Sequence, residues 1–420
     1  MNQKADKIAI IGNGCAGAEC VKALRESGCR GEIHLFTSSR WPVYNPMLTT
    51  YYASGKISFE QMFPYGQDNF FYQNYGVNAH PASPVIALDA GNRVVANQDG
   101  FELHYGQCLI ASGASPVLPP VEGIGSKRVY LMRTVEDAIR LKKAMEGKPR
   151  RALVIGASLV GIKVAELLYQ AGVKVCLADL AERILPLTAH PACSGIIEER
   201  LTRLGLKLRF GLNLKRLEET ASGIKACFDR NRSETADFLV FCIGVRPNID
   251  FVDRQQIEVR EGILVDNRMM TRVPGLYAAG DVSQQILGGK PLATGSWSNA
   301  RYQGRTAGRN MAGMTDSFPG NIPQNIAHFM GIDFVSIGET VEYDTIEKRS
   351  DGCDFSLLFW RGGKLVGANL IGGYEGSGPL KNTLIKGSIQ SKSEYQAALD
   401  PFQSILVNLN FKYGRKSGTG

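Results

Sequence analysis

The residues with the clearest chemistry lie in one glycine-rich segment, residues 151–186. Gly156 and Gly161 stand between an apolar run at residues 152–155, which suits a buried parallel strand, and an amphipathic stretch typical of a helix. A helix that begins at such a turn offers unpaired N–H groups and a positive dipole to a pyrophosphate. Asp179 follows the next expected strand, and a carboxylate ~20 residues after the glycines can bind ribose hydroxyls. The segment is therefore predicted to bind a dinucleotide.

A second glycine-rich segment opens the chain at residues 7–39. Gly12, Gly14 and Gly17 match G-x-G-x-x-G between an expected strand and an expected helix, the context that makes this motif specific. The strand tip that follows carries no acidic residue and reads Thr37, Ser38, Ser39 and Arg40. A hydroxyl can still bind a ribose, although less strongly than a charged acceptor. Two dinucleotide sites in one chain imply that two dinucleotides meet, and a nicotinamide and a flavin are the obvious pair.

Other expected strands end in small or polar residues that can reach these sites. One buried strand ends in Ala111 and Gly113, where small side chains let the backbone approach a cofactor. A second apolar strand ends in Gly280 and Asp281.

Three more segments complete the predicted sites. The prolines and aromatic residues of residues 41–57, Pro46 among them, indicate a loop and a helix against the ligand of the first site. An apolar strand at residues 238–243 closes at Gly244, and a later helix begins with Trp297.

Composition limits the classes of function. At 420 residues the chain is expected to form two to three domains. It has no run of ~18 apolar residues, so no membrane span is predicted, and its N-terminus runs directly into a strand without a signal peptide. Nine scattered cysteines without metal-ligand spacing favour a reducing cytoplasm and no metal site.

The formal net charge is +8, and part of it lies near the C-terminus. The basic residues of this tail are Lys381, Lys386, Lys392, Lys412, Arg415 and Lys416. They contribute to solubility or form a docking face for an acidic redox protein. Nucleic acid is not an expected partner, because no basic stripe is interleaved with aromatic residues.

Five ordered segments resemble glutathione-reductase-like flavoproteins over nearly the whole chain: KIAIIGNGCAGAE, LIASGAS, VIGASLVGIKVAE, CIGVRPN and GLYAAGDV. Three others are similar to narrower groups. YNPMLTTYYASGKI and HFMGIDFVSIGE resemble rubredoxin reductases and the flavoprotein module of assimilatory nitrite reductases, and GSWSNARYQGRTAGRN resembles a helix of ferredoxin reductases.

The resemblance implies an α/β fold with two Rossmann-like dinucleotide-binding domains. An FAD domain (residues 1–115 and 244–320) is interrupted by an NAD(P)H domain (residues 116–243). A C-terminal α+β interface domain (residues 321–420) follows, which often makes dimers in this family, although several relatives are monomers. A homodimer is thus allowed but not required.

The resemblance also assigns residues to each cofactor. The FAD set is Gly12, Gly14, Gly17, Ala111, Gly113, Gly280, Asp281 and Trp297. To these the strand tip and the following loop add Ser38, Ser39, Arg40 and Pro46. For NAD(P)H the resemblance places Gly156 and Gly161 at the pyrophosphate, Asp179 at the adenosine ribose and Gly244 at the nicotinamide. Asp179 favours NADH over NADPH because it would repel a 2′-phosphate, an effect that Arg183 could relieve.

Two departures from the family concern redox chemistry. The disulfide members carry C-x4-C after the first strand tip, whereas here Cys15 and Cys20 have that spacing inside the glycine motif. Five residues along a helix leave the two thiols ~140° apart, so we expect packing rather than a disulfide. No thiol lies near residues 47–50, where single-cysteine members need one. The flavin is therefore expected to be the only redox centre.

A third departure concerns a charged pair beside the flavin of ferredoxin reductases, a lysine after the proline-rich loop and a glutamate from the second nucleotide helix. The corresponding positions here are Thr50 and Lys163. We hypothesise that Lys163 reaches the flavin edge and stabilises negative charge on the reduced cofactor. The alternative is a solvent-facing lysine on an amphipathic helix. The five histidines form no cluster in the sequence and are not assigned as acids or bases, although the family places His328 near the flavin.

The predicted function is a cytoplasmic FAD-dependent oxidoreductase that takes hydride from NADH. It passes electrons to a ferredoxin, a rubredoxin or a partner subunit without a redox-active disulfide. Two alternatives stay open: an NADH oxidase or small-molecule reductase that uses the flavin alone, and an FAD-holding structural or regulatory subunit with weak turnover.

Overall fold

The computed structural model describes residues 7–66, 70–287, 290–292, 295–352, 354–374 and 377–386. These residues group into two compact units. The first contains residues up to Ala181 together with Gly205–Asn321, and the second contains Glu182–Leu204 together with the residues from Ile322 onward. Four residues of the basic tail lie outside the described residues: Lys392, Lys412, Arg415 and Lys416. The domain boundaries at residues 115, 243 and 320 stay predictions.

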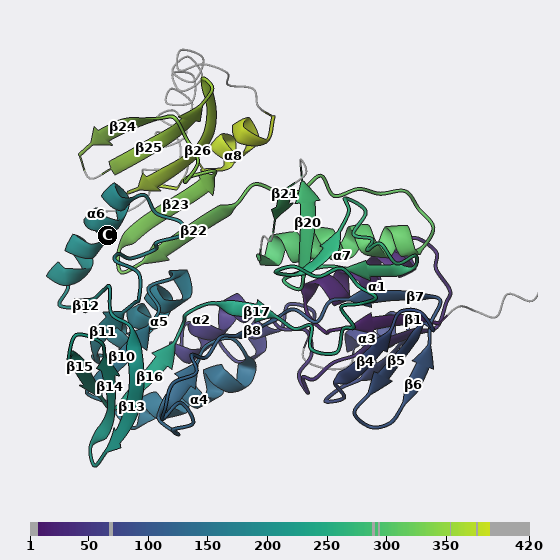
Figure 1. The fold of residues 1–420 in the computed structure, drawn as a ribbon, viewed down its shortest axis with the longest axis horizontal. Coiled ribbons are helices and arrows are strands. Elements are labelled where there is room, and N and C mark those ends of the chain that lie inside the picture. Colours follow the sequence, from purple (N-terminus) through teal and green to yellow (C-terminus); the bar gives the residue numbers. More distant parts are fainter. Residues whose placement is uncertain are drawn as a thin grey trace, which may run out of the picture. The chain divides into compact units, whose positions relative to one another are not determined.

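The first unit contains two five-stranded parallel sheets (Figure 1). One sheet has the order β19-β7-β1-β2-β3. Its strands are β1 (Ile8–Ile11), β2 (Ile33–Phe36), β3 (Val77–His80), β7 (Gln107–Ile110) and β19 (Leu276–Ala278). Because β19 comes from a distant part of the sequence and pairs with β7, the second glycine-rich segment is inserted between strands of one sheet.

The second sheet has the order β12-β11-β10-β16-β9. Its strands are β9 (Val129–Leu131), β10 (Arg151–Ile155), β11 (Lys174–Ala178), β12 (Lys207–Arg209) and β16 (Phe238–Phe241). Helix α5 (Leu159–Gln170) connects β10 to β11. The apolar residues of β10 and β16 are buried throughout, as expected for parallel strands with both faces covered.

Smaller elements complete the first unit. The antiparallel strands are β4 (Val85–Asp89), β5 (Val94–Asn97), β6 (Glu102–His104), β13 (Leu214–Thr220), β14 (Gly223–Phe228), β15 (Ser233–Ala236), β8 (Ala114–Pro116) and β17 (Val245–Pro247). A mixed three-stranded sheet contains β18 (Ile263–Val265), β20 (Ser283–Leu287) and β21 (Lys290–Leu292). The short helices are η1 (Pro46–Leu48), α2 (Thr49–Ala53), η2 (Glu60–Met62) and α3 (Phe70–Asn74).

Helix α1 (Cys15–Glu26) packs closely against helix α7 (Trp297–Met311). A Cβ atom on Gly304 would lie 2.2 Å from the carbonyl oxygen of Ala16, and one on Gly308 would lie 2.6 Å from that of Cys20. The helices therefore touch backbone to backbone, and two glycines of α7 make this approach possible.

Helix α4 (Val135–Glu146) links the two parallel sheets to the loop after β2. It begins with a capping box, in which the side chains of Thr134 and Asp137 bind each other's backbone N–H groups. The indole N–H of Trp41 donates to Glu136 Oε1 at 2.6 Å. Val135 is buried with two residues of the loop region, Met62 and Phe63. Residues 41–63 are therefore held against α4.

The second unit contains one five-stranded antiparallel sheet with the order β22-β23-β26-β25-β24. Its strands are β22 (Gln324–Phe329), β23 (Ile332–Gly338), β24 (Thr345–Asp351), β25 (Asp354–Arg361) and β26 (Lys364–Ile371). Helices α6 (Pro191–Arg203) and α8 (Ser377–Lys386) contact this sheet. A hairpin turn at Gly362 and Gly363 connects β25 to β26.

Helix α6 begins at Pro191, because proline at the first helical position follows a His190 cap that accepts from Ala192 N–H. The strands β12, β13 and β14 follow it along the chain. No helix among the described residues is long and apolar enough to cross a membrane.

Candidate functional site

In the first glycine turn, two glycines are required for packing and the third is free to serve a ligand. Gly12 has a φ of +119°, and a Cβ atom there would lie 2.0 Å from the carbonyl oxygen of Ala111. A Cβ on Gly17 would lie 2.2 Å from the Gly12 oxygen, so both glycines are required for packing. Gly14 differs, because a Cβ there would meet nothing within 4 Å. It caps α1 without a side-chain acceptor, which leaves an open helix N-terminus that fits a pyrophosphate.

The second glycine turn places its first and last glycines as the first turn does, but its central residue is a serine. Gly156 has a φ of +112° and stands where a Cβ would be 2.3 Å from the Cys242 oxygen. A Cβ on Gly161 would be 1.8 Å from the Gly156 oxygen. The central residue is Ser158, whose hydroxyl donates to Cys242 O at 3.0 Å and accepts from Gly161 N–H at 3.4 Å. This helix is thus capped by a side chain, and α5 is fixed to the end of β16.

Asp179 lies beside this second turn. Its two carboxylate oxygens accept hydrogen bonds from Ala157 N–H at 2.6 Å and from Ala181 N–H at 2.8 Å. The carboxylate therefore braces the turn and stands at the tip of β11. Gly244, three residues after the end of β16 in the same sheet, has a φ of +110° and open space around it.

Asp281 has a partner that the sequence analysis missed. Arg133, the residue before the α4 cap, places its guanidinium 2.6 Å from Asp281 Oδ2, and both side chains are largely buried. Gly280 has a φ of +82°, and its N–H donates to Gln303 Oε1 at 2.8 Å. A guanidinium is a strong donor to phosphate oxygens, so this pair can serve a dinucleotide. In the sequence Arg133 has no motif around it that distinguishes it from an exposed arginine.

The other predicted FAD residues are partly occupied by contacts within the chain. Ser39 Oγ accepts from Trp41 N–H at 3.0 Å, and the Arg40 guanidinium lies 4.8 Å from the Trp41 ring. The carbonyl of Pro46 accepts from Thr49 Oγ1 at 2.6 Å. Ser38 is exposed, and Gly113 has a φ of +69° with free space around it.

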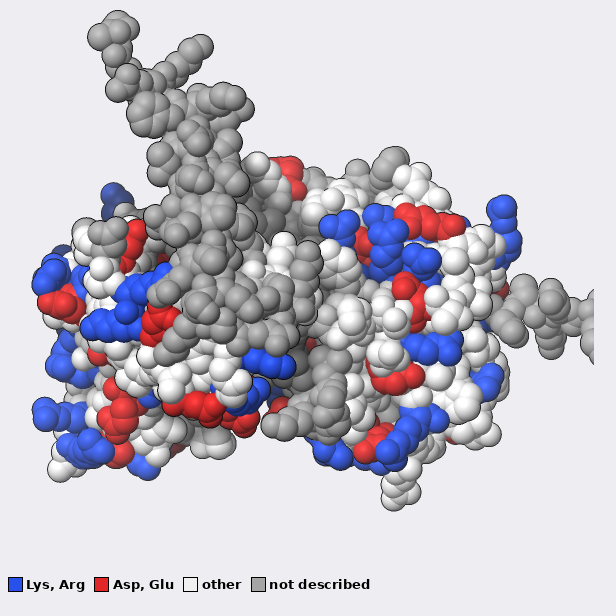
Figure 2. Space-filling view, turned by 90° about the horizontal axis from the view of Figure 1, so that it is seen from above, with Lys and Arg blue, Asp and Glu red and all other residues white. Residues whose placement is uncertain are grey.

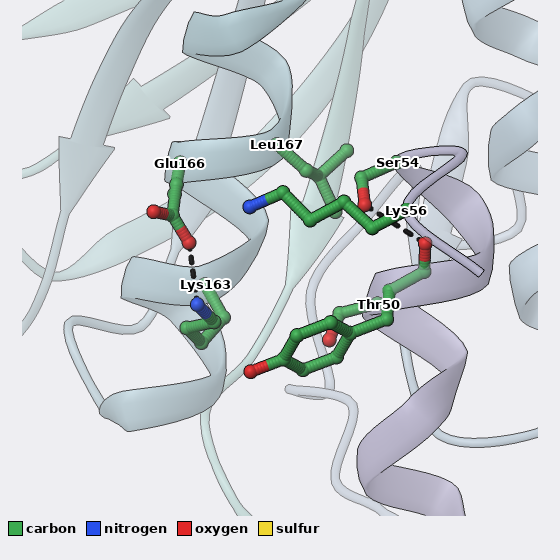
Figure 3. A pocket seen from close by; sticks show the side chains of 7 residues that line it. Thr50, Ser54, Lys56, Lys163, Glu166 and Leu167 are labelled. Atoms are coloured by element: carbon green, nitrogen blue, oxygen red, sulfur yellow. Dashed lines mark hydrogen bonds and ion pairs between the residues drawn. The ribbon is translucent and has the colours of Figure 1, made fainter. Parts of the chain in front are cut away.

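Helices α2 and α5 enclose a small polar pocket (Figure 3). Its lining residues are Thr50, Tyr51, Ser54, Lys56, Lys163, Glu166 and Leu167. The volume of about 10 Å³ is close to the minimum that holds a water molecule. The structure therefore brings Thr50 and Lys163 to one pocket.

Lys163 is not the solvent-facing lysine of the alternative interpretation. Its Nζ lies 2.5 Å from Glu166 Oε2 and 5.2 Å from the centre of the Tyr51 ring. The lysine side chain is 19% exposed and that of Glu166 only 5%. The sequence analysis did not single out Glu166. A glutamate in the mostly apolar segment from Ile162 to Leu168, three residues after a lysine, could have indicated a buried ion pair.

The cysteines behave as packing residues, as predicted. Cys15 and Cys20 are buried free thiols. Cys15 Sγ lies 3.7 Å from the carbonyl oxygen of Trp297, and Cys20 Sγ lies 3.7 Å from Met311 Sδ. Burial raises the pKa of Cys15 to about 12 and raises that of Cys20 further, so both stay protonated at neutral pH. In the part of the chain that the structure describes, no group of three or more His, Cys, Asp or Glu side chains could hold a metal ion.

The prediction of isolated histidines is wrong for one pair. His34 Nδ1 lies 3.0 Å from His80 Nε2, and His34 Nε2 lies 2.9 Å from Glu32 Oε1. The residues are distant in sequence, but their strands β2 and β3 are neighbours in one sheet. Burial, followed by the charge of His34, lowers the pKa of His80, whereas Asp99 opposes this shift.

Replacement of Gly14 separates binding from folding. Gly14→Val should fold, because a Cβ atom at this position meets nothing within 4 Å and the change of cap residue costs about 1 kcal/mol. The valine would occupy the open helix N-terminus, so the FAD content, measured from visible absorbance, should fall at least about tenfold. Gly125→Val is the matched control, because Gly125 is an exposed loop residue with equally free surroundings. A folded Gly14→Val protein with full FAD content would contradict the assignment.

The histidine pair predicts an acid-sensitive first sheet. Since the pKa of His80 is lower in the folded state, the unfolded state binds more protons, and stability is lost as pH falls below the ordinary histidine pKa of about 6.5. His80→Gln, which can still donate to His34, should lose less thermal stability than the parent between pH 7 and pH 5. Exposed His104→Gln is the control and should follow the parent. Identical pH profiles for His80→Gln and the parent would refute this.

Comparisons with known proteins agree with this geometry. Residues 6–304 match the family described as pyridine nucleotide-disulphide oxidoreductase. The epsilon subunit of NADH-dependent phenylglyoxylate dehydrogenase from Aromatoleum evansii is 32% identical over 337 residues, which cover 80% of this chain and 79% of that protein. Rubredoxin-NAD(+) reductase from Ectopseudomonas oleovorans is 24% identical over 370 residues, 87% of this chain and 95% of the reductase.

Solved structures share the fold. The covalent complex of putidaredoxin reductase with putidaredoxin superposes with a TM-score of 0.83 at 24% identity and covers 90% of this chain and 93% of that one. The predicted α/β fold class is thereby confirmed, as are the resemblance and the enzyme class of a flavoprotein oxidoreductase with FAD and NAD(P)H as cofactors. The chain belongs to the pyridine nucleotide-disulphide oxidoreductase family.

Proposed function

We propose that this protein takes hydride from NADH into FAD and passes the electrons to an acceptor protein through the flavin edge. The observation that carries the proposal is the presence of two glycine turns on two parallel sheets within one compact unit. When bound, FAD supplies the chemistry that converts a two-electron hydride donor into a source of single electrons. The chain's own residues bind and orient the two cofactors.

Each turn has a distinct part in this function. The open α1 N-terminus at Gly14 and the Arg133–Asp281 pair support a role in FAD binding. The second turn and Asp179 support NADH binding, and Lys163 supplies a cation at the pocket between α2 and α5. A fixed cation favours negative charge that develops nearby.

The burial of Cys15 and Cys20, the two thiols at the C-x4-C spacing, supports exit of electrons to a separate protein. Cys15 and Cys20 are buried and protonated, so neither can relay electrons as a thiolate. Relatives named as a rubredoxin reductase and as a dehydrogenase subunit support two kinds of acceptor, a small redox carrier and a partner subunit.

The charges along helix α7 are paired rather than of one sign. Three arginines at four-residue spacing, Arg301, Arg305 and Arg309, follow its outer side. Each has one acidic neighbour, at 3.5 Å, 3.7 Å and 3.3 Å respectively. Figure 2 shows one face on which Lys and Arg side chains lie among Asp and Glu rather than in an unbroken stripe. Electrostatic steering requires a patch of one sign that meets the opposite sign on a partner, so these paired charges favour no particular acceptor.

The cellular location and the oligomeric state are also part of the proposal. A cytoplasmic location is supported by the free cysteines of the described chain. The homodimer that the family resemblance allows stays a prediction.

Anaerobic titration with NADH, followed by admission of air, tests the function. The flavin absorbance should bleach rapidly and recover slowly in air, because electrons wait for a protein acceptor. Rapid recovery in air would favour the alternative of an NADH oxidase. A flavin that NADH does not bleach would refute the hydride-transfer proposal and favour a structural subunit.

Asp179 should set the choice of nicotinamide cofactor. Asp179→Asn keeps an acceptor for Ala157 N–H but removes the charge that repels a 2′-phosphate. The ratio of kcat/KM for NADH to that for NADPH should fall by about tenfold or more. Glu182→Gln, the same change of charge at an exposed position three residues later, should leave the ratio unchanged. An unaltered ratio in Asp179→Asn would exclude this role.

A further inference from the structure

We propose that Lys163 and Glu166 together set the reduction potential of the bound flavin, with the two residues acting in opposite directions. Glu166 is then a positioning residue that holds the lysine and partly cancels its charge. The proposal deepens the proposed function and rests on it in one respect, which is that the flavin binds beside this pocket.

The pocket joins elements of both dinucleotide sites. Thr50 and Tyr51 come from α2, directly after the Pro46 turn that is assigned to FAD, and Lys163 comes two residues after Gly161 of the second turn. Hydride transfer requires the reacting atoms to be about 3–3.5 Å apart, so the two cofactor rings must meet between the elements that hold them. Helices α2 and α5 contact each other at this pocket.

The Lys163–Glu166 pair is largely shielded from water, whereas Lys56 is exposed. Glu166 is 4% exposed, and its Oε2 lies 2.5 Å from Lys163 Nζ, while Gln170 Nε2 lies 3.4 Å from its Oε1. A buried carboxylate is tolerated when it is paired and hydrogen-bonded. Charges in such surroundings act over longer distances than surface charges, because little water screens them.

A second cation faces the same carboxylate. Figure 3 shows Lys56 extending from the side of α2 toward α5, next to Glu166. With two ammonium groups and one carboxylate, the three side chains carry a combined charge of +1. Loss of Lys163 would leave Glu166 facing Lys56, and loss of Glu166 would leave two cations in the pocket.

This arrangement differs in its consequences from a merely structural ion pair. If the pair served only to stabilise helix α5, either substitution would weaken the fold in the same direction. An electrostatic pair beside a redox group shifts the potential one way when the cation is lost and the other way when the anion is lost. The sign of the two shifts therefore separates the explanations.

The test uses the FAD-loaded full-length chain and needs no NADH. The flavin is equilibrated anaerobically with a reference dye of known potential, and the reduced-to-oxidised ratio is measured at a fixed dye ratio. Lys163→Met should lower this ratio about tenfold and Glu166→Gln should raise it about tenfold, each a shift of about 30 mV for a two-electron couple. The double variant should return close to the parent. The exposed pair on β13 provides controls of equal charge change, Arg216→Met and Glu218→Gln, which should not shift the ratio.

Shifts of the same sign, or no shift, in the two single variants would overturn the proposal. If Glu166→Gln fails to fold or to hold FAD, Lys56→Met takes its place and should lower the ratio in the same direction as Lys163→Met but by less, because Lys56 is exposed. An unchanged ratio there would also overturn the proposal. Failure of the proposed function is visible separately. In that case the dye reduces the parent flavin but NADH does not.

Discussion

Close backbone approach at the two glycine turns is the constraint on which the rest of this structure depends. At each turn the chain passes close to the residue that follows a neighbouring strand of the same sheet. A Cβ atom on Gly12 would overlap the carbonyl oxygen of Ala111, and one on Gly156 would overlap that of Cys242. The strain-free positive φ of glycine permits both turns. The direction of α1 and α5, and with it the direction of their N-terminal N–H groups, follows from this contact.

The two turns use the same geometry for different local purposes. The first leaves its central position empty and its helix without a side-chain cap, whereas the second fills that position with Ser158 and braces the loop with Asp179. A turn that is already hydrogen-bonded loses less conformational entropy on binding than one that its ligand must order. The asymmetry fits a chain that keeps one cofactor bound and exchanges the other.

Sequence reasoning found what is local in the chain and missed what depends on distance in space. The glycine motifs, the strand tips and the roles of Cys15 and Cys20 were predictable because spacing along one helix or one turn determines them. Arg133 and the His34–His80 pair were not, since their partners lie on other strands and 46 or more residues away. Glu166 was predictable only in part. Its lysine partner is on the same helix, but its burial comes from the packing of α2 and α5.

Helix α4 has a mechanical consequence for the first unit. The chain crosses between the two parallel sheets at β8 and β17, which pair with each other and form a short two-stranded connection. A connection of two strands alone would let one sheet rotate against the other. The hydrogen bond from Trp41 to Glu136 and the cluster around Val135 add a third point of attachment, away from the crossing strands. Any rotation of one sheet against the other would therefore have to break the Trp41–Glu136 hydrogen bond and separate Val135 from Met62 and Phe63.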